Sequence, residues 1–200
     1  MRVLGINAPE VGRRGQPGEP FSRVASNEAQ AFLKHSSHIL LVPGQEREDR
    51  YGRLLAHVYR DDGASLEAHL LTQGLAFHSP VPPNLAQGDC YAALEAQARQ
   101  AKLGIWSDRG IPPVAGDRVD SGGYQRVRGQ VTSVSFRRNW WIELDDHFTA
   151  VIQPADQGRF ERHEVAAWQG KTVEIKGWVY AVNGELRMKL ETPWVIRTVD

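Results

Sequence analysis

Hydrophobic and polar positions follow two different patterns, and the change from one to the other divides the chain. In the first half, apolar residues recur at helical spacing between short alternating runs, which predicts helices mixed with strands. The predicted helices cover residues 22–36, 65–74 and 90–104. The predicted strands cover residues 2–6, 37–44 and 52–64. This order indicates an α+β unit with a small sheet. Residues 10–22, rich in Gly, Pro and charge, are expected to form a long exposed loop. The proline-broken residues 77–84 are expected to be irregular, and Gly74 is expected to cap the end of the helix over residues 65–74.

Beyond residue 122 the pattern is almost entirely that of strands. The predicted strands cover residues 124–136, 140–146, 148–153, 171–182, 185–191 and 194–199. Asn183-Gly184 is a strong hairpin signal, and residues 158–170 read as a helical or irregular patch between the third and fourth strands. Five or six short strands interrupted at that point are typical of an OB-type barrel.

Residues 111–123 are rich in Pro, Gly and Asp and have no periodic pattern, which is typical of a linker. We therefore expect a first domain over residues 1–110, a linker over 111–121 and a second domain over 122–200. The predicted fold class is α+β, mainly β.

The amino-acid composition limits the classes of function that the chain can have. Hydrophobic residues make up 41% and charged residues 24% of the chain, as in ordinary globular proteins. The formal net charge is zero, so any binding of an anion must come from local placement of charge. Cys90 is the only cysteine, which excludes an internal disulfide and a thiolate zinc site, and we expect it to be buried. No apolar run reaches the roughly twenty residues that span a bilayer, so we expect no membrane.

Three polar clusters could carry chemistry. One is the opening between residues 77–84 and the loop over residues 10–22, which could form one rim of a site. Arg2 precedes the turn Asn7, Ala8 and Glu10, and Arg53 begins a strand beside Tyr51. Two guanidinium groups could clamp a phosphodiester while a carboxylate orients or deprotonates water. The oxygen-rich turn could also hold a hard divalent cation. A solvated surface with an ion pair is the alternative reading of the same residues.

Four motifs support the first reading. The runs "RVLGINAPE", "DRYGRLLAHVY", "LEAHLLTQGLA" and "EAQARQAKLGIWS" occur in this order over residues 1 to about 108. In order and spacing they resemble the staphylococcal (micrococcal) nuclease family, the thermonucleases. The resemblance implies an OB barrel with three helices that hydrolyses DNA and RNA phosphodiesters with calcium.

The resemblance also implies roles for particular residues. The two arginines of the family pattern fall on Arg2 and Arg53, which would hold the scissile phosphate. The glutamate falls on Glu10, the expected general base or water-orienting carboxylate. The metal ligands fall on Asn7, in place of an acid, and on the backbone carbonyl of Ala8.

The sequence departs from the family pattern at its start. Family members have two further strands before the arginine strand and one more aspartate ligand, so we expect a first barrel without its first β-hairpin and weak calcium binding. Met1 is then either a misassigned start or a true truncation. Under the first hypothesis the protein could be periplasmic or secreted. Under the second, a homo-oligomer or the second domain would cover the open edge.

Further contacts to nucleic acid are expected in both domains. Tyr51, and Phe77 in place of the family's tyrosines after "GLA", are candidates in the first domain. The second resembles the accessory domain of some proteobacterial thermonuclease-like proteins, and its candidates lie in "FRRNWW": Phe136, Arg137, Arg138, Trp140 and Trp141. Aromatic and basic residues together suit stacking on single strands. Adjacent strand residues face opposite sides, so at least one of these tryptophans should point into the barrel. Trp178 and Trp194 are expected in the core or a domain interface.

The favoured function is cation-dependent hydrolysis of DNA or RNA, with single strands as the expected partner. The alternative is a catalytically degenerate module that binds nucleic acid or protein without turnover. A scaffold that binds no nucleic acid is a third reading that the sequence leaves open.

Overall fold

A computed structural model of the chain describes residues 1–12, 15 and 17–199. The chain divides into two compact units, Met1–Ile111 and Pro112–Asp200, each with its own cluster of buried hydrophobic residues. The segment predicted as a linker contributes to the second unit, because β6 (Val114–Ala115) pairs with β7 (Gly123–Phe136). The short 3-10 helix η2 (Gly116–Arg118) follows β6.

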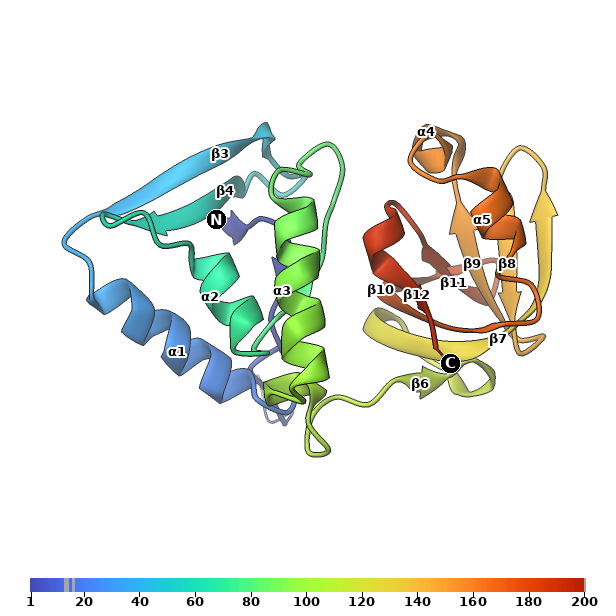
Figure 1. The fold of residues 1–200 in the computed structure, drawn as a ribbon, viewed down its shortest axis with the longest axis horizontal. Helices are drawn as coiled ribbons and strands as arrows, with labels where there is room; N and C mark the ends of the chain where they lie inside the picture. The colour runs from blue at the N-terminus through green and yellow to red at the C-terminus, as the bar shows by residue number, and fades with distance from the viewer. Residues whose placement is uncertain (13–14, 16, 200) are drawn as a thin grey trace. The chain divides into compact units, whose positions relative to one another are not determined.

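The described part of the first unit contains three helices and five strands. The helices are α1 (Ser22–Lys34), α2 (Leu66–Thr72) and α3 (Gly88–Gln100), followed by the 3-10 helix η1 (Gly104–Trp106). The strands are β1 (Arg2–Val3), β2 (Ile6–Asn7), β3 (Ile39–Glu48), β4 (Leu54–Arg60) and β5 (Phe77–His78). Strands β1, β4 and β3 form an open sheet, and β2 pairs with β5. Figure 1 shows α1 and α2 below the β3–β4 hairpin.

The strand predicted over residues 2–6 is broken in two. Gly5 has a φ of +70°, a backbone conformation that ends regular pairing. Before the break, β1 runs parallel to β4, and after it β2 runs antiparallel to β5. Asn7, predicted in a turn, therefore lies in a strand and is 8% exposed. The segment after residue 76, predicted as irregular, supplies its partner strand β5.

Helix α2 is the centre of the first core. It contacts α1, α3 and β4 and buries Leu66, Leu70 and Leu71. Its end is fixed by Gly74, whose φ is +64° and whose added Cβ would lie 2.5 Å from the carbonyl oxygen of Leu103. Only glycine fits this close approach of two helix ends, as the sequence pattern predicted for the end of this helix.

Strand β3 is exposed along its apolar half. Ile39, Leu40, Leu41 and Val42 are 38–59% exposed, and β4 is the only strand paired with β3 in the described chain. Consecutive strand residues point to opposite faces, so both faces of this edge strand are apolar and uncovered. This edge of the sheet is therefore open to pairing with another strand.

The second unit contains a closed barrel. Its further elements are β8 (Trp140–Leu144), β9 (Phe148–Ile152), α4 (Pro154–Gln157), α5 (Arg162–Ala166), β10 (Thr172–Val182), β11 (Glu185–Lys189), η3 (Pro193–Val195) and β12 (Ile196–Thr198). Strands β7, β8, β9, β11 and β10 are neighbours in that order, and β10 pairs back with β7 to close the ring. Helices α4 and α5 fall between β9 and β10, where the OB order places them (Figure 1). The predicted α+β, mainly β fold class is confirmed.

One prediction of burial is wrong. Cys90 is exposed, because α3 turns Tyr91 and Glu95 toward the interior instead. Trp178, expected in the core or a domain interface, lies outside the core of its unit, with 49% of its surface exposed and its ring 5.8 Å from that of Tyr124. Within the described chain, no helix combines the length and hydropathy needed to cross a membrane.

Candidate active site

The described structure gathers four of the sequence-predicted residues around one cavity in the first unit. Arg2, Asn7, Ala8 and Glu10 all line a cavity of about 290 Å³. Pairing with β4 positions Arg2, and the break at Gly5 redirects the chain so that the following residues return to the same cavity. The cavity therefore combines a guanidinium, an amide, a backbone carbonyl and a carboxylate.

The floor of this cavity is apolar. Val3 and Ile6 contribute from the strands, and Ala25 and Leu70 from helices α1 and α2. An apolar wall lowers the local dielectric and strengthens the interaction of Arg2 or Glu10 with a charged ligand. The arrangement suits recognition of an anionic group near one carboxylate.

A second carboxylate lies beside Glu10. The backbone N–H of Glu10 donates to Glu19 Oε2 at 2.6 Å, and the Glu10 carbonyl accepts from the N–H of Glu19 at 3.0 Å. These bonds join the two ends of the loop predicted as exposed, whose residues 13, 14 and 16 lie outside the described chain. Sequence reasoning missed Glu19, because an acid in a loop carries no periodic signal.

Arg53 does not line the cavity. Asp49 Oδ2 accepts from Arg53 Nε at 2.7 Å and lies 2.6 Å from its Nη2, while Oδ1 accepts from the backbone N–H groups of Tyr51 and Arg53. Partial desolvation opposes ionisation of Asp49, but the bonds from Arg53 and Tyr51 outweigh it and hold its pKa at about 2. The register pairs Arg2 with Leu55, so Arg53 enters β4 close to Arg2 along the sheet.

The turn that carries Arg53 also presents an aromatic ring. Tyr51 is 68% exposed, and the guanidinium groups of Arg50 and Arg53 lie 4.8 Å and 5.5 Å from its ring centroid. Arginine stacked on an exposed aromatic ring is an arrangement suited to a nucleobase and its phosphate.

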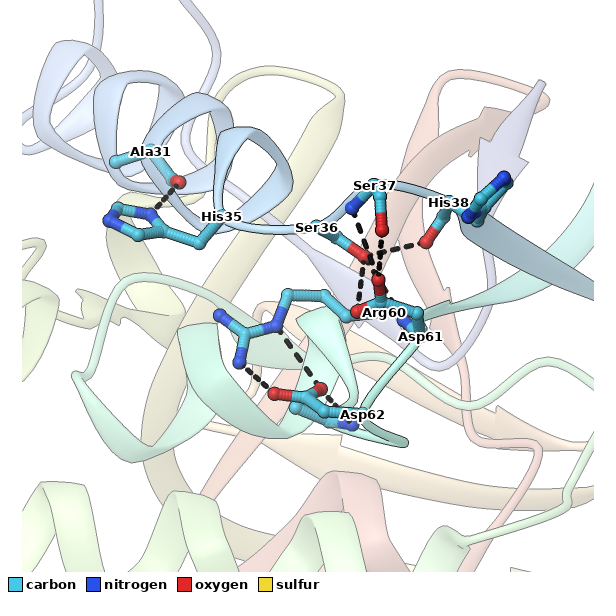
Figure 2. Close-up of polar contacts among 9 residues, drawn as sticks. Ala31, His35, Ser36, Ser37, His38, Arg60, Asp61 and Asp62 are labelled. Atoms are coloured by element: carbon cyan, nitrogen blue, oxygen red, sulfur yellow. Dashed lines mark hydrogen bonds and ion pairs between the residues drawn. The ribbon is translucent and has the colours of Figure 1, made fainter.

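The opposite end of the hairpin is anchored by Asp61. Figure 2 shows its carboxylate accepting from the hydroxyls of Ser36 and Ser37, at 2.8 Å and 2.6 Å, and from the N–H of Ser37. These hydrogen bonds, led by that of the Ser37 hydroxyl, lower the pKa of Asp61 to about 2. Arg60 pairs with Asp62 beside it. The contacts tie the start of β3 to the end of β4.

Phe77 lies away from solvent. Its side chain is 3% exposed and packs edge-on against Trp106, with ring centroids 5.3 Å apart. His78 is 1% exposed, and its backbone N–H donates to Glu95 Oε1. Neither ring is presented to a ligand in this conformation, because β5 faces the interior.

In the second unit the structure separates the two adjacent tryptophans. Trp140 packs against the core with Phe136, 5.2 Å between ring centroids. Trp141 lines a hollow on the barrel wall together with Arg137. Arg138 is exposed in the same turn. The expectation that one tryptophan points inward is confirmed.

The oxygen atoms near Glu10 are a partial match to a calcium site. Oxygen donors suit calcium, a hard cation that binds roughly six to eight oxygen atoms from carboxylates, carbonyls and water. Asn7 and Ala8 are uncharged donors, and the described residues hold no cluster of three or more His, Cys, Asp or Glu side chains able to bind a metal. The described donors therefore fit calcium poorly in number and charge.

The first unit is similar in sequence to known nucleases. A model of the family described as staphylococcal nuclease homologue matches residues 1–108. The SPbeta prophage-derived endonuclease YokF of Bacillus subtilis is 35% identical over 111 residues, which cover 55% of this chain and 37% of the relative. Endonuclease YncB of the same species is 34% identical over 111 residues, covering 55% of this chain and 52% of the relative. The thermonuclease of Staphylococcus intermedius is 29% identical over 106 residues, covering 53% and 62%. The chain thus spans between about a third and two thirds of these relatives' lengths.

Proposed function

Because this chain belongs to the staphylococcal nuclease family, we propose that it hydrolyses phosphodiester bonds of DNA or RNA and prefers single strands. The observation that carries the proposal is the cavity shared by Arg2, Asn7, Ala8 and Glu10. It groups a phosphate-binding cation with a carboxylate, the two functions that hydrolysis of a phosphodiester requires.

In the proposed mechanism each residue has one role. Arg2 binds a non-bridging oxygen of the scissile phosphate from the cavity wall, and Arg53 approaches the same phosphate from the start of β4. Both stabilise the negative charge that grows on the phosphate as water attacks. Glu10 accepts one proton of the attacking water as the new P–O bond forms and the bond from phosphorus to the leaving oxygen breaks. The leaving alkoxide takes a proton from solvent, to which the exposed Glu10 returns its own.

Calcium is the proposed cation, with Asn7 and the Ala8 carbonyl near it. When bound, a divalent cation would polarise the phosphate and supply charge that the protein lacks. Because the described donors fit calcium poorly, we expect weak binding. Glu19, whose carboxylate accepts from the backbone N–H of Glu10, is a further carboxylate in the same loop.

Contacts outside the cavity would hold the rest of the strand. Tyr51, stacked between Arg50 and Arg53, is proposed to contact a base near the cleaved bond. Arg137 and Arg138 are proposed to contact phosphates from the second unit. Phe77 and Trp140 are left out of the proposal, because their rings pack inward.

Cleavage of a fluorescent single-stranded DNA in calcium and in EDTA tests the roles of Arg53 and the ion. We expect Arg53→Ala to lower the rate by about 100-fold, and EDTA to abolish it. Arg47→Ala is the matched control, because Arg47 is an exposed arginine of β3 on the same hairpin. Equal rates for Arg53→Ala and the wild type would refute the role of Arg53.

The competing proposal is a module that binds nucleic acid without turnover. The pairing of Arg53 with Asp49 and the small number of carboxylates at the cavity favour it. Binding of single-stranded DNA without cleavage at any calcium concentration would identify it.

A further inference from the structure

A second polar hollow lies on the outer wall of the barrel, outside the residues matched by the nuclease family model. It encloses about 310 Å³ and is lined by residues of β7, β8, β9 and β11 and of the turn after β7. The strand register sets Glu143, Thr149 and Arg187 in one row across three neighbouring strands. Their side chains alternate with the core residues Ile142 and Ala150, so they point away from the core.

The hollow contains a stacked cation and aromatic ring. The Arg187 guanidinium lies 4.9 Å from the centroid of the Trp141 ring. Arg187 also pairs with Glu185, with 2.6 Å between Nη2 and Oε2. This ion pair fixes one N–H of a group that has five, so Arg187 retains donors for a ligand while its plane is held against the indole.

The charges of the hollow balance. Arg137 and Arg187 contribute two positive charges, and Glu143 and Glu185 two negative ones. A bare phosphate would gain little beside Arg187, because its guanidinium is already paired with Glu185. A neutral planar group that stacks and forms hydrogen bonds fits better, and Thr149 and Glu143 offer a hydroxyl and a carboxylate to its edge.

We propose that this hollow binds a nucleobase of a single-stranded nucleic acid, stacked on the Trp141–Arg187 pair. Arg137, exposed at the end of β7, then lies where the phosphate adjoining that base leaves the hollow. Stacking on an aromatic ring beside arginines is how OB barrels bind single strands with little sequence preference. The barrel is thus a second nucleic-acid site, independent of catalysis in the first unit.

The test measures fluorescence anisotropy of a labelled oligothymidylate of about ten nucleotides with the full chain in EDTA, so that cleavage plays no part. Trp141→Ala should weaken binding by about tenfold, while Trp141→Phe should retain most of the affinity. Trp178→Ala is the matched control, because Trp178 is also an exposed tryptophan of the barrel. Near-ultraviolet circular dichroism verifies that each variant is folded.

Salt dependence tests the phosphate contact. Arg137→Ala should reduce the slope of log affinity against log salt by about 0.7, the value for one phosphate contact on a single strand. Glu48→Gln, an exposed substitution in the first unit, should leave the affinity unchanged. Because binding is measured in EDTA without cleavage, a failure of the nuclease proposal is distinguishable from a failure of this one. Equal affinities of the wild type and Trp141→Ala for the oligothymidylate would overturn the proposal. The same result is expected if the hollow binds an oligosaccharide rather than a nucleobase.

Discussion

At the scale of single residues, the sequence predicted chemistry better than orientation. The motif around Glu10 predicted four residues that the structure brings to one cavity. Strand alternation predicted that Trp140 and Trp141 would face opposite sides, but only the register with β7 decides which one points inward. The ion pair between Arg53 and Asp49 depends on the geometry of the hairpin turn, so it could not be predicted from composition or from the spacing of hydrophobic residues.

Asp61 provides a residue-scale prediction about pH. Its pKa in the folded protein, about 2, lies below the ordinary value, so its ionised form stabilises the fold. That stabilisation is fully present above the unfolded-state pKa of about 4 and is lost as the pH falls toward 2. We expect Asp61→Asn to lower the unfolding midpoint of the first unit at neutral pH and to have no effect near pH 2.

Thermal unfolding followed by circular dichroism across this pH range makes the comparison. Glu48→Gln, which removes an exposed charge from the same hairpin, serves as the control and should shift the midpoint little. A difference between Asp61→Asn and the wild type that persists below pH 2 would contradict the assigned cause.

At the scale of elements, periodic segments were predicted well and short ones poorly. Helices α1, α2 and α3 and the barrel strands appear where their patterns placed them, because each buries a long continuous face. Strands β2 and β5 pair with each other over two residues each, and such long-range pairing leaves no local pattern. Gly74 was the clearest local sequence signal, because it marked the end of α2.

The exposed edge of β3 provides an element-scale prediction. Its four consecutive apolar residues favour pairing with another strand, and a second copy of the chain is the proposed partner. Leu40→Lys should suppress concentration-dependent association, measured by light scattering. Because Leu40 is 59% exposed, the free energy of unfolding should change by less than about 0.5 kcal/mol. Unchanged association would show that the edge is not the contact.

At the scale of the whole molecule, the chain has two separate hydrophobic cores, one in each unit. The shift from mixed to all-strand patterning is the sequence feature that led us to expect two domains, but it did not locate the end of the linker. Val114–Ala115 lacks a periodic pattern and becomes a strand only by pairing with β7. The sequence alone did not predict the strand at Val114–Ala115, because its pairing joins residues on either side of a turn-rich segment.

Glu174 tests whether the two units unfold independently. Its carboxylate is 3% exposed and accepts from Arg126, Arg128 and Arg197. Burial opposes its ionisation, but the three arginines outweigh this and lower its pKa to about 2. Glu174→Gln leaves buried guanidinium charge uncompensated and should cost about 3 kcal/mol. Calorimetry should show two transitions, of which this substitution lowers only one. A single transition that shifts as a whole would contradict independent unfolding.

Glu10, as the carboxylate that activates water, is the residue on which the proposed nuclease activity depends most. The most direct test is the rate at which the purified chain cleaves a single-stranded DNA reporter in saturating calcium, with Glu10→Gln and the control Glu48→Gln assayed beside it. We predict that Glu10→Gln lowers the rate by about 10²- to 10⁴-fold while Glu48→Gln retains the wild-type rate. Equal rates for Glu10→Gln and the wild type, or no cleavage by the wild type, would contradict the proposed nuclease activity at this cavity.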